Sequence, residues 1–242
     1  MNLVIDVGNT RTKLAVFDKN NIITVVVVSQ SEVLDGIKEL RKSYSQLHLA
    51  IVASVGVLDQ AVINYLDIHF NLLVLSHETP LPFNNLYATP KTLGIDRIAL
   101  VCASVQQFSN KNVLIIDAGT CITYDFISAK NEYLGGAISP GIRMRYKAMH
   151  NLTANLPLLE TEIPENFIGD STTSAMHCGV VNGVLNEIDG SIAQYQEKFS
   201  DLTVILTGGD TKMLSKQLKS SIFANSNFLL QGLNFILQYN TH

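Results

Sequence analysis

The chain has 242 residues, which at roughly 150 residues per domain fits one large domain or two small ones. Apolar residues make up 47% of it, enough for a buried core, and this excludes a disordered chain. Charged residues make up only 16%, against about 25% in an average soluble protein, and the net charge is −4.

Several classes of partner and site are disfavoured by this composition. An acidic chain with few Lys and Arg residues lacks the basic surface that nucleic-acid binding requires. Cys102, Cys121 and Cys178 have no CxxC spacing, so neither a disulfide framework nor a zinc site is indicated. No apolar run approaches the ~20 residues of a membrane span, and the first residues lack the basic leader of a signal peptide. We therefore expect a cytoplasmic protein.

The first half of the chain alternates between predicted strands and predicted helices. Apolar and β-branched runs predict the strands, and apolar residues at helical spacing predict the helices. In chain order we expect a hairpin over residues 3–18, a strand over 22–28, a helix over 32–44, a strand over 48–53, a helix over 58–69, a strand over 72–75 and a helix over 98–105. This alternation predicts an α/β fold with helices packed on a mixed sheet.

The second half follows a similar order. We expect a hairpin over residues 114–127, a strand over 133–139, a helix over 142–151, a loop over 153–171, a long helix over 173–198, a strand over 203–207 and a helix capped by Asp210. Apolar residues recur along one side of the long helix, and this stripe could pack on the sheet, on a partner subunit or on both. The stripe consists of Ala175, Met176, Val180, Val184, Ile188, Ile192 and Tyr195.

The two hairpins resemble each other. Each has an apolar strand, an Asp, a small residue, a Gly, a hydroxyl-bearing loop and a second strand, and the two aspartates, Asp6 and Asp117, are 111 residues apart. That spacing is close to half the chain and indicates a duplicated domain. We therefore predict two similar domains, 1–109 and 110–242, each with a mixed sheet flanked by helices, and a cleft between them.

The loop that follows Asp6 has the residues of a phosphate-binding turn. Gly8 lets a phosphate approach the backbone, and Asn9, Thr10 and Lys13 can donate hydrogen bonds. An ordinary hairpin turn rich in Gly and Asn would look similar in isolation. The second copy, Asp117-Ala118-Gly119-Thr120, favours the functional interpretation, and Gly208-Gly209 is a third place where backbone could approach a ligand closely.

A set of spaced motifs narrows the interpretation. They are D-x-G-N-T-x-x-K at 6–13, Tyr87, G-x-D-R at 94–97, D-x-G-T at 117–120, G-G-x-x-x-P-G at 135–141, T-A-x-L-P at 153–157 and Thr172. Together they resemble type III pantothenate kinases, which belong to the actin and sugar kinase superfamily. The resemblance implies two ribonuclease H-like domains and transfer of the γ-phosphoryl group of ATP to the 4′-hydroxyl of pantothenate, in the first step of coenzyme A biosynthesis.

The resemblance also implies roles for individual residues. Asp96 would be the catalytic base, Asp6 would hold Mg²⁺ directly or through water, and Asp117 would bind a monovalent cation, K⁺ or NH₄⁺. The ATP-binding positions would be Asp6, Val7, Gly8, Asn9, Thr10, Arg11, Thr12, Lys13 and Thr120. The pantothenate-binding positions would be Tyr87, Gly94, Ile95, Asp96, Arg97 and Thr172. Similar kinases are homodimers, and the long helix over 173–198 is a candidate for the interface.

Other interpretations of these residues stay open at this point. Asp96 could merely cap the helix that follows it, and Arg97 could hold a substrate carboxylate or pair with an acidic side chain. A two-metal nuclease with Asp6 and Asp117 as ligands is a second function, disfavoured by the low content of Lys and Arg. A regulatory relative that binds a nucleotide without catalysis is a third.

Overall fold

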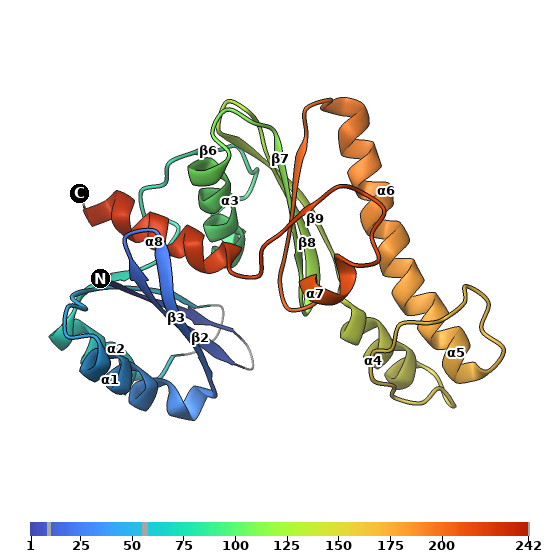
Figure 1. Cartoon of the computed structure of the whole chain (residues 1–242), viewed down its shortest axis with the longest axis horizontal. Helices are drawn as coiled ribbons and strands as arrows, with labels where there is room; N and C mark the ends of the chain where they lie inside the picture. Colours follow the sequence, from blue (N-terminus) through green and yellow to red (C-terminus); the bar gives the residue numbers. More distant parts are fainter. Residues whose placement is uncertain (9–10, 55–57, 242) are drawn as a thin grey trace. The chain divides into compact units, whose positions relative to one another are not determined.

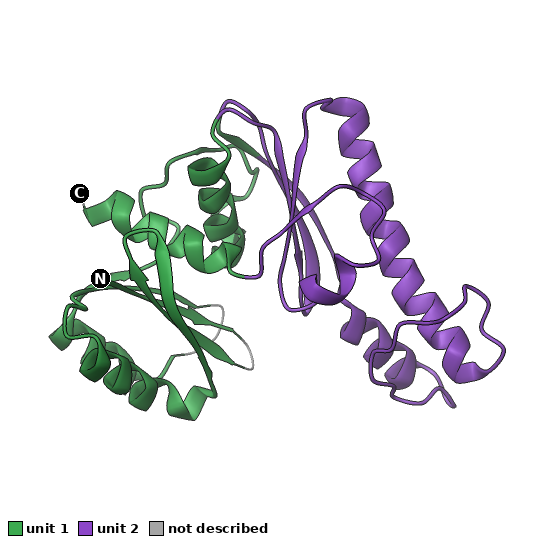
Figure 2. Ribbon diagram, viewed as in Figure 1, with its two compact units in different colours: residues 1–109, 131–133, 227–242 green, residues 110–130, 134–226 purple. Residues whose placement is uncertain are grey.

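The computed structural model describes residues 1–8, 11–54 and 58–241, which form two compact units (Figures 1 and 2). Unit 1 comprises Met1–Ser109, Asn131–Tyr133 and Asn227–His242, and unit 2 comprises Asn110–Lys130 and Leu134–Ser226. The first division between the units falls after Ser109, and the C-terminal segment belongs to unit 1. No helix among the described residues is long and apolar enough to cross a membrane.

Unit 1 is built on a mixed sheet with strand order β3-β2-β1-β4-β5. β1 pairs antiparallel with β2 and parallel with β4. The strands are β1 (Asn2–Val7), β2 (Thr12–Asp18), β3 (Asn21–Val28), β4 (Leu49–Ser54) and β5 (Asn71–Val74). The helices are α1 (Val33–Ser43), α2 (Gln60–His69), α3 (Ile95–Gln107) and α8 (Phe228–Thr241), with short 3₁₀ turns η1 (Gln30–Glu32) and η2 (Pro90–Thr92). A two-residue strand, β6 (Asn84–Asn85), pairs with Glu132 and Tyr133.

Each face of this sheet is covered by its own helices. Leu3, Ile5 and Val7 of β1 form a core with apolar side chains of α1 and α2. Side chains alternate between the two faces of a strand, so Asn2, Val4 and Asp6 point to the opposite face. On that face the side chain of Asn2 donates a hydrogen bond of 2.8 Å to Asn234 of α8.

Helix α8 is not among the predicted elements, and it packs closely on α3. A Cβ atom at Gly232 would overlap the carbonyl oxygen of Ala99, so only glycine permits this helix crossing. Asn234 and Gln238 of α8 both donate to the carbonyl oxygen of Lys19, at 2.8 and 2.9 Å. The C-terminal segment is therefore an integral layer of unit 1.

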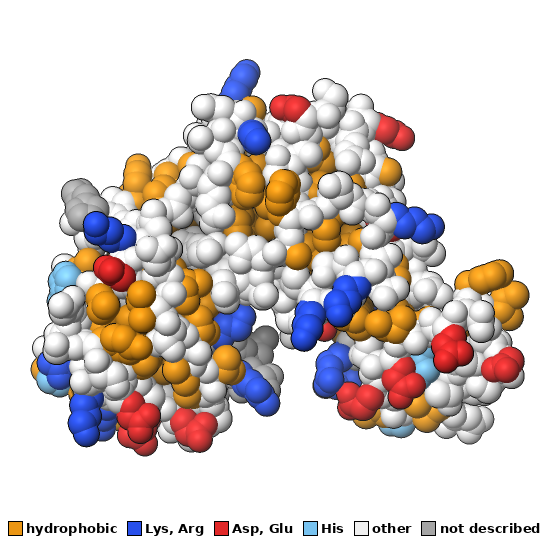
Figure 3. Space-filling view, in the orientation of Figure 1, with side chains coloured by type: hydrophobic (Ala, Val, Ile, Leu, Met, Phe, Trp, Pro, Cys, Tyr) orange, Lys and Arg blue, Asp and Glu red, His pale blue; other side chains and the backbone are white. Residues whose placement is uncertain are grey.

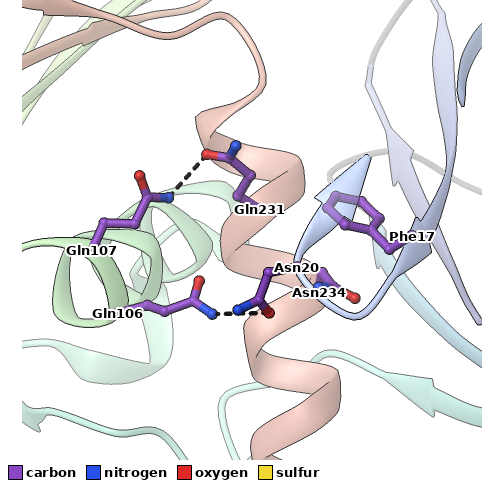
Figure 4. Close-up of a pocket in the computed structure, with 6 residues that line it drawn as sticks. All are labelled: Phe17, Asn20, Gln106, Gln107, Gln231 and Asn234. Atoms are coloured by element: carbon purple, nitrogen blue, oxygen red, sulfur yellow. Dashed lines mark hydrogen bonds between the residues drawn. The ribbon is translucent and has the colours of Figure 1, made fainter. Parts of the chain in front are cut away.

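A polar cavity of about 220 Å³ lies between α3, α8 and the β2–β3 turn (Figure 4). Its wall is almost entirely carboxamide side chains, which hydrogen-bond to one another, as Gln107 does to Gln231 at 2.9 Å. The lining residues are Phe17, Asn20, Gln106, Gln107, Gln231 and Asn234. These amides join the three elements without introducing charge.

Unit 2 repeats the architecture, with strand order β11-β10-β7-β8-β9. β7 pairs antiparallel with β8 and parallel with β10, as β1 does with β2 and β4. The strands are β7 (Val113–Ala118), β8 (Cys121–Ile127), β9 (Glu132–Pro140, of which 132–133 belong to unit 1), β10 (Thr203–Thr207) and β11 (Phe223–Ala224). The helical segments are α4 (Ile142–Leu152), α5 (Thr172–His177), the π-helical η3 (Cys178–Asn182), α6 (Gly183–Lys198) and α7 (Thr211–Leu214). The predicted α/β class with two similar mixed sheets is confirmed.

The long predicted helix is present as the continuous run α5, η3 and α6. Five residues of its apolar stripe belong to the buried core of unit 2, and Tyr195 packs against that core. Those five are Met176, Val180, Val184, Ile188 and Ile192. The stripe therefore packs on the sheet of its own unit, and this side of the helix is not available to a partner subunit.

The α3–α8 crossing generates a stability prediction. Gly232→Ala places a methyl group on the backbone of Ala99, so we expect it to lower the free energy of unfolding by roughly 1–3 kcal/mol or more. Gly190→Ala in α6 is the matched control, because nothing lies within 4 Å of its Cβ position, and it should be neutral or stabilising by roughly 0.5–1 kcal/mol. Urea unfolding of both variants measures this. Equal free energies of unfolding would contradict the close crossing.

Candidate active site

Asp6 lies one residue before the end of β1, on the face of the sheet away from α1 and α2. It is only partly exposed, and its cross-strand neighbour in the antiparallel register is Lys13 of β2. A carboxylate and an ammonium at such a pair of positions attract each other. The strand register thus brings together the first and last residues of the predicted phosphate-binding motif.

The turn between these two strands is closed by the backbone. The amide of Gly8 donates to the carbonyl oxygen of Arg11 at 3.1 Å. Val7 and Thr12, which flank the turn, are buried, so of Val7 only the main chain is available to a nucleotide. The Thr12 hydroxyl has no hydrogen-bond partner among the described residues, and Arg11 is exposed. Asn9 and Thr10, predicted to bind ATP, lie outside the described residues.

Asp96 lies in the first turn of α3, after the N-cap residue Gly94. Its Oδ1 accepts a hydrogen bond of 2.9 Å from the backbone N–H of Arg97, so the carboxylate folds back over the start of the helix. A Cβ at Gly94 would overlap that oxygen. Any side chain at Gly94 would therefore displace the predicted base, which is a physical reason for glycine in the G-x-D-R motif.

Asp6 and Asp96 are close enough for their charges to interact. Burial and, to a smaller extent, the charge of Asp96 raise the pKa of Asp6, Lys13 lowers it, and the net result is a pKa of about 6. A carboxylate with such a pKa is ionised at neutral pH only at a cost in free energy. A cation bound beside these two carboxylates would remove that cost.

Arg97 and Tyr87 form a second pair beside Asp96. The Arg97 guanidinium lies 5.6 Å from the centre of the Tyr87 ring, and only 4% of the arginine surface is exposed. Tyr87 also lies 6.0 Å, ring to ring, from the fully buried Tyr133. Unit 1 therefore brings together Asp6, Lys13, Asp96, Arg97 and Tyr87, five of the predicted site residues. Ile95 is partly exposed at the first position of α3.

The second aspartate turn has an equivalent place in unit 2. Leu114, Ile116 and Ala118 of β7 belong to the core with α4 and α6, so Asp117 points to the opposite face, as Asp6 does in unit 1. Its cross-strand neighbour is Thr123, where unit 1 has a lysine. Gly208, with a φ of 95°, lies against Asp117, because a Cβ there would overlap the carboxylate.

The Gly119-Thr120 turn is held from behind by the end of β9. The backbone N–H of Gly141 donates to the carbonyl oxygen of Thr120 at 3.1 Å, and a Cβ at Gly141 would overlap the Gly119 carbonyl. Thr120 itself is exposed. The glycines at 141 and 208 thus line two sides of this turn, a role that the sequence motifs indicate only as close backbone approach.

The predicted cap at Asp210 is correct in position but not in its hydrogen bond. Asp210 is the N-cap residue of α7, but its side chain makes no capping hydrogen bond. Instead the Thr211 hydroxyl donates to the carbonyl oxygen of Gly208 at 2.7 Å, and the Asp210 N–H donates to Ala118 at 3.0 Å. Burial raises the pKa of the Asp210 carboxyl, while Arg143 lowers it. Asp210 is a carboxylate near the second turn that was not predicted as a site residue.

Thr172, predicted to bind substrate, lies on a separate element of unit 2. It is the first residue of α5 and is exposed. The preceding Ser171 and the following Ser174 form a capping box, in which each side chain accepts a hydrogen bond from the other's backbone. This cap fixes the helix start and leaves the Thr172 side chain open to solvent.

Comparison with known proteins identifies the family. The family model for type III pantothenate kinases matches residues 2–194. The chain belongs to the type III pantothenate kinase family. As a member of it, the chain is an ATP-dependent kinase that acts on pantothenate.

The similarity to individual relatives covers the whole chain. The type III pantothenate kinase of Christiangramia forsetii is 52% identical over 240 residues, 99% of each chain. That of Flavobacterium johnsoniae is 49% identical over 239 residues, 99% of this chain and 98% of the relative. A ROK family glucokinase from Streptomyces griseus, solved with glucose and AMPPNP, has a TM-score of 0.53 and 11% identity over 99% of this chain and 98% of its own. The glucokinase shows the sugar kinase fold alone.

The raised pKa of Asp6 predicts that its ionised carboxylate lowers the stability of this kinase. Its folded pKa of about 6 exceeds the ordinary 3.8, so the ionised carboxylate destabilises the fold as the pH rises through 6. We expect Asp6→Asn to raise the free energy of unfolding by about 1–3 kcal/mol at pH 8, and to have little effect below pH 4.

Thermal unfolding without ligands at both pH values checks this prediction. Asp67→Asn is the control, because Asp67 is exposed on α2 and substitution of an exposed side chain should change stability little. A destabilised Asp6→Asn variant at pH 8 would show that the carboxylate contributes to folding instead of opposing it.

Proposed function

We propose that this kinase transfers the γ-phosphoryl group of ATP to the 4′-hydroxyl of pantothenate, in the first step of coenzyme A biosynthesis, with Asp96 as general base. The observation that supports the assignment is the placement of the Asp96 carboxylate. It is held at the start of α3 by the Arg97 N–H and is close enough to Asp6 for their charges to interact. Phosphoryl transfer to an alcohol requires a base near the hydroxyl and positive charge near the phosphates, which a cation held by Asp6 would supply.

In the proposed reaction, the pantothenate hydroxyl hydrogen-bonds to a carboxylate oxygen of Asp96. Asp96 accepts the proton as the hydroxyl oxygen forms a bond to the γ-phosphorus of ATP, and the bond from that phosphorus to the β,γ-bridging oxygen breaks. ADP leaves with both electrons of the broken bond. The products are 4′-phosphopantothenate, ADP and a proton that Asp96 releases to solvent.

The remaining side chains of unit 1 hold the acceptor. Arg97 supplies a guanidinium for the carboxylate of pantothenate, and its low exposure strengthens such an ion pair. Tyr87 packs on Arg97 and offers the face against which the substrate chain would lie. Gly94 and Ile95 contribute main-chain contacts. Thr172, which belongs to unit 2, is a further proposed contact through its exposed hydroxyl.

Each of the two aspartate turns carries proposed contacts to ATP. Lys13 neutralises phosphate charge, and backbone groups around Gly8 approach the phosphates closely. Thr120, exposed on the second turn, contacts ATP through its hydroxyl. The other proposed ATP contacts are Asp6, Val7 through its main chain, Asn9, Thr10, Arg11 and Thr12.

Two cations are part of the proposal. The buried Asp6 carboxylate, with its raised pKa, fits a divalent ion such as Mg²⁺, held directly or through water, which would neutralise charge on the transferring phosphate. We assign K⁺ or NH₄⁺ to Asp117, whose carboxylate lies near the end of β7 on the face of the sheet opposite the core of unit 2. The cytoplasm stays the predicted location, because the kinase uses ATP.

We also propose a homodimer, on evidence other than the buried stripe of α6. Phe167 and Ile168 are 83% and 71% exposed in the loop before α5, and no atom of the described residues lies within 4 Å of the Cβ position at Gly179. Exposed apolar side chains near an open glycine favour close packing with a second copy. Equilibrium sedimentation should give twice the mass of 26.6 kDa, and a monomer at micromolar concentration would overturn the proposal.

The general base is tested by Asp96→Asn. Asparagine keeps an oxygen to accept the Arg97 N–H but cannot take a proton, so we expect turnover to fall by roughly 10²-fold or more while ATP binding is retained. ADP release, measured with and without pantothenate, reports the turnover, and calorimetry reports the binding.

Asp35→Asn is the matched control, because Asp35 is also a carboxylate in the first turn of a helix but is exposed on α1. Its turnover should equal that of the wild-type enzyme. Wild-type turnover in Asp96→Asn would refute the assignment of the base. Absence of pantothenate-dependent ADP release in the wild-type enzyme would favour a regulatory relative.

A further inference from the structure

An ion pair in unit 2 is so far without a function. Arg145 of α4 and Glu187 of α6 contact each other, and their side chains are only 23% and 30% exposed. The hydroxyl of Tyr124, which is buried in β8, donates to Oε1 of Glu187 at 2.9 Å. Burial raises the pKa of Glu187, but hydrogen bonds from Arg145, Ser139 and Tyr124 outweigh it and leave the pKa below its usual range. Glu187 is therefore an ionised anchor for Arg145.

The other donors of Arg145 hold the end of β9. Its Nε donates to the carbonyl oxygen of Pro140 at 2.9 Å, and its Nη2 donates to the Ser139 hydroxyl at 3.0 Å. Gly183, one helical turn before Glu187, lies beside the same guanidinium, with 3.8 Å between its Cβ position and Nη1. A guanidinium presents its donors in a fixed plane, so anchoring by Glu187 fixes the direction of the bond to Pro140.

The residue after Pro140 is the one that backs the second aspartate turn. Gly141 donates to the Thr120 carbonyl at 3.1 Å and leaves no space for a side chain against Gly119. A continuous series of contacts therefore runs from Glu187 through Arg145 and residues 139–141 to the Gly119-Thr120 turn. Every member lies in unit 2.

We propose that Glu187 is a positioning residue for the nucleotide: by anchoring Arg145 it fixes residues 139–141 and, through them, the Gly119-Thr120 turn. The inference rests on the proposed function, because it takes Thr120 as an ATP contact. The contacts of Glu187 and Arg145 therefore affect the affinity for ATP and leave the proton transfer at Asp96 unaffected.

Glu187→Gln tests the proposal. The variant keeps the size of the side chain but removes the charge that orients Arg145, so we expect the KM for ATP to rise roughly 3- to 10-fold. The kcat and the KM for pantothenate should stay within about twofold of the wild-type values. Calorimetric titration with ATP should show the same loss of affinity without turnover.

Arg145→Lys is a second variant with the same expectation. It retains a positive charge opposite Glu187 but lacks the planar Nε donor to Pro140. A KM for ATP that rises in both variants would show that the planar donor geometry of Arg145 is needed as well as its charge.

Asp189→Asn is the matched control for a structural effect. Asp189 lies two residues after Glu187 on α6 and accepts hydrogen bonds from the N–H groups of Lys219 and Ser220 and from the Ser220 hydroxyl, at 2.7–3.3 Å. Its loss should lower the melting temperature without changing the KM for ATP.

Two results would overturn the inference: an unchanged KM for ATP in Glu187→Gln despite a lower melting temperature, or an equal rise in Asp189→Asn. Failure of the proposed function is seen separately, as a wild-type enzyme that releases no ADP with pantothenate. The calorimetric titration then decides the inference on ATP affinity alone.

Discussion

The two-residue alternation of side chains along β1 and β7 is the constraint on which the site depends. Burying Leu3, Ile5 and Val7 against α1 and α2 forces Asp6 to the other face of the sheet, where α3 carries Asp96. A one-residue slip in register would reverse both placements. The apolar core thus positions a carboxylate that opposes folding when ionised, a cost that the proposed divalent cation would relieve.

The two halves share this constraint but differ in charge. Lys13 lies opposite Asp6, whereas Thr123 lies opposite Asp117. Four residues, 8–11, separate the last paired residues of β1 and β2, whereas three, 119–121, separate those of β7 and β8. The lysine lowers the pKa of Asp6 and can also neutralise phosphate. Asp117 has a neutral partner and a glycine beside its carboxylate. The duplicated scaffold therefore places its two aspartates in different electrostatic environments.

Sequence patterns predict what is local. Strand alternation and helical spacing identify the duplicated hairpins and the long helix, because each depends on residues close in the chain. Helix α8 is missed because its crossing with α3 joins Gly232 to Ala99 across the chain. Asp210 begins α7 as predicted, but its side chain makes no capping hydrogen bond, and its N–H bonds to Ala118, which is distant in the chain. The role of Gly94 depends on where the Asp96 carboxylate lies, and no spacing rule contains that information.

The chain has few charged residues, and the positions of the partly buried ones are informative. Broad neutral and apolar areas separate the charged side chains on the face shown in Figure 3. The pair Arg143–Glu160, with side chains 72% and 81% exposed, contributes little to stability. Arg145 and Glu187 are withdrawn from water, where an ion pair rarely stabilises more than apolar packing would. Retaining charges at such positions is therefore better explained by the orientation they impose on the nucleotide turn than by stability.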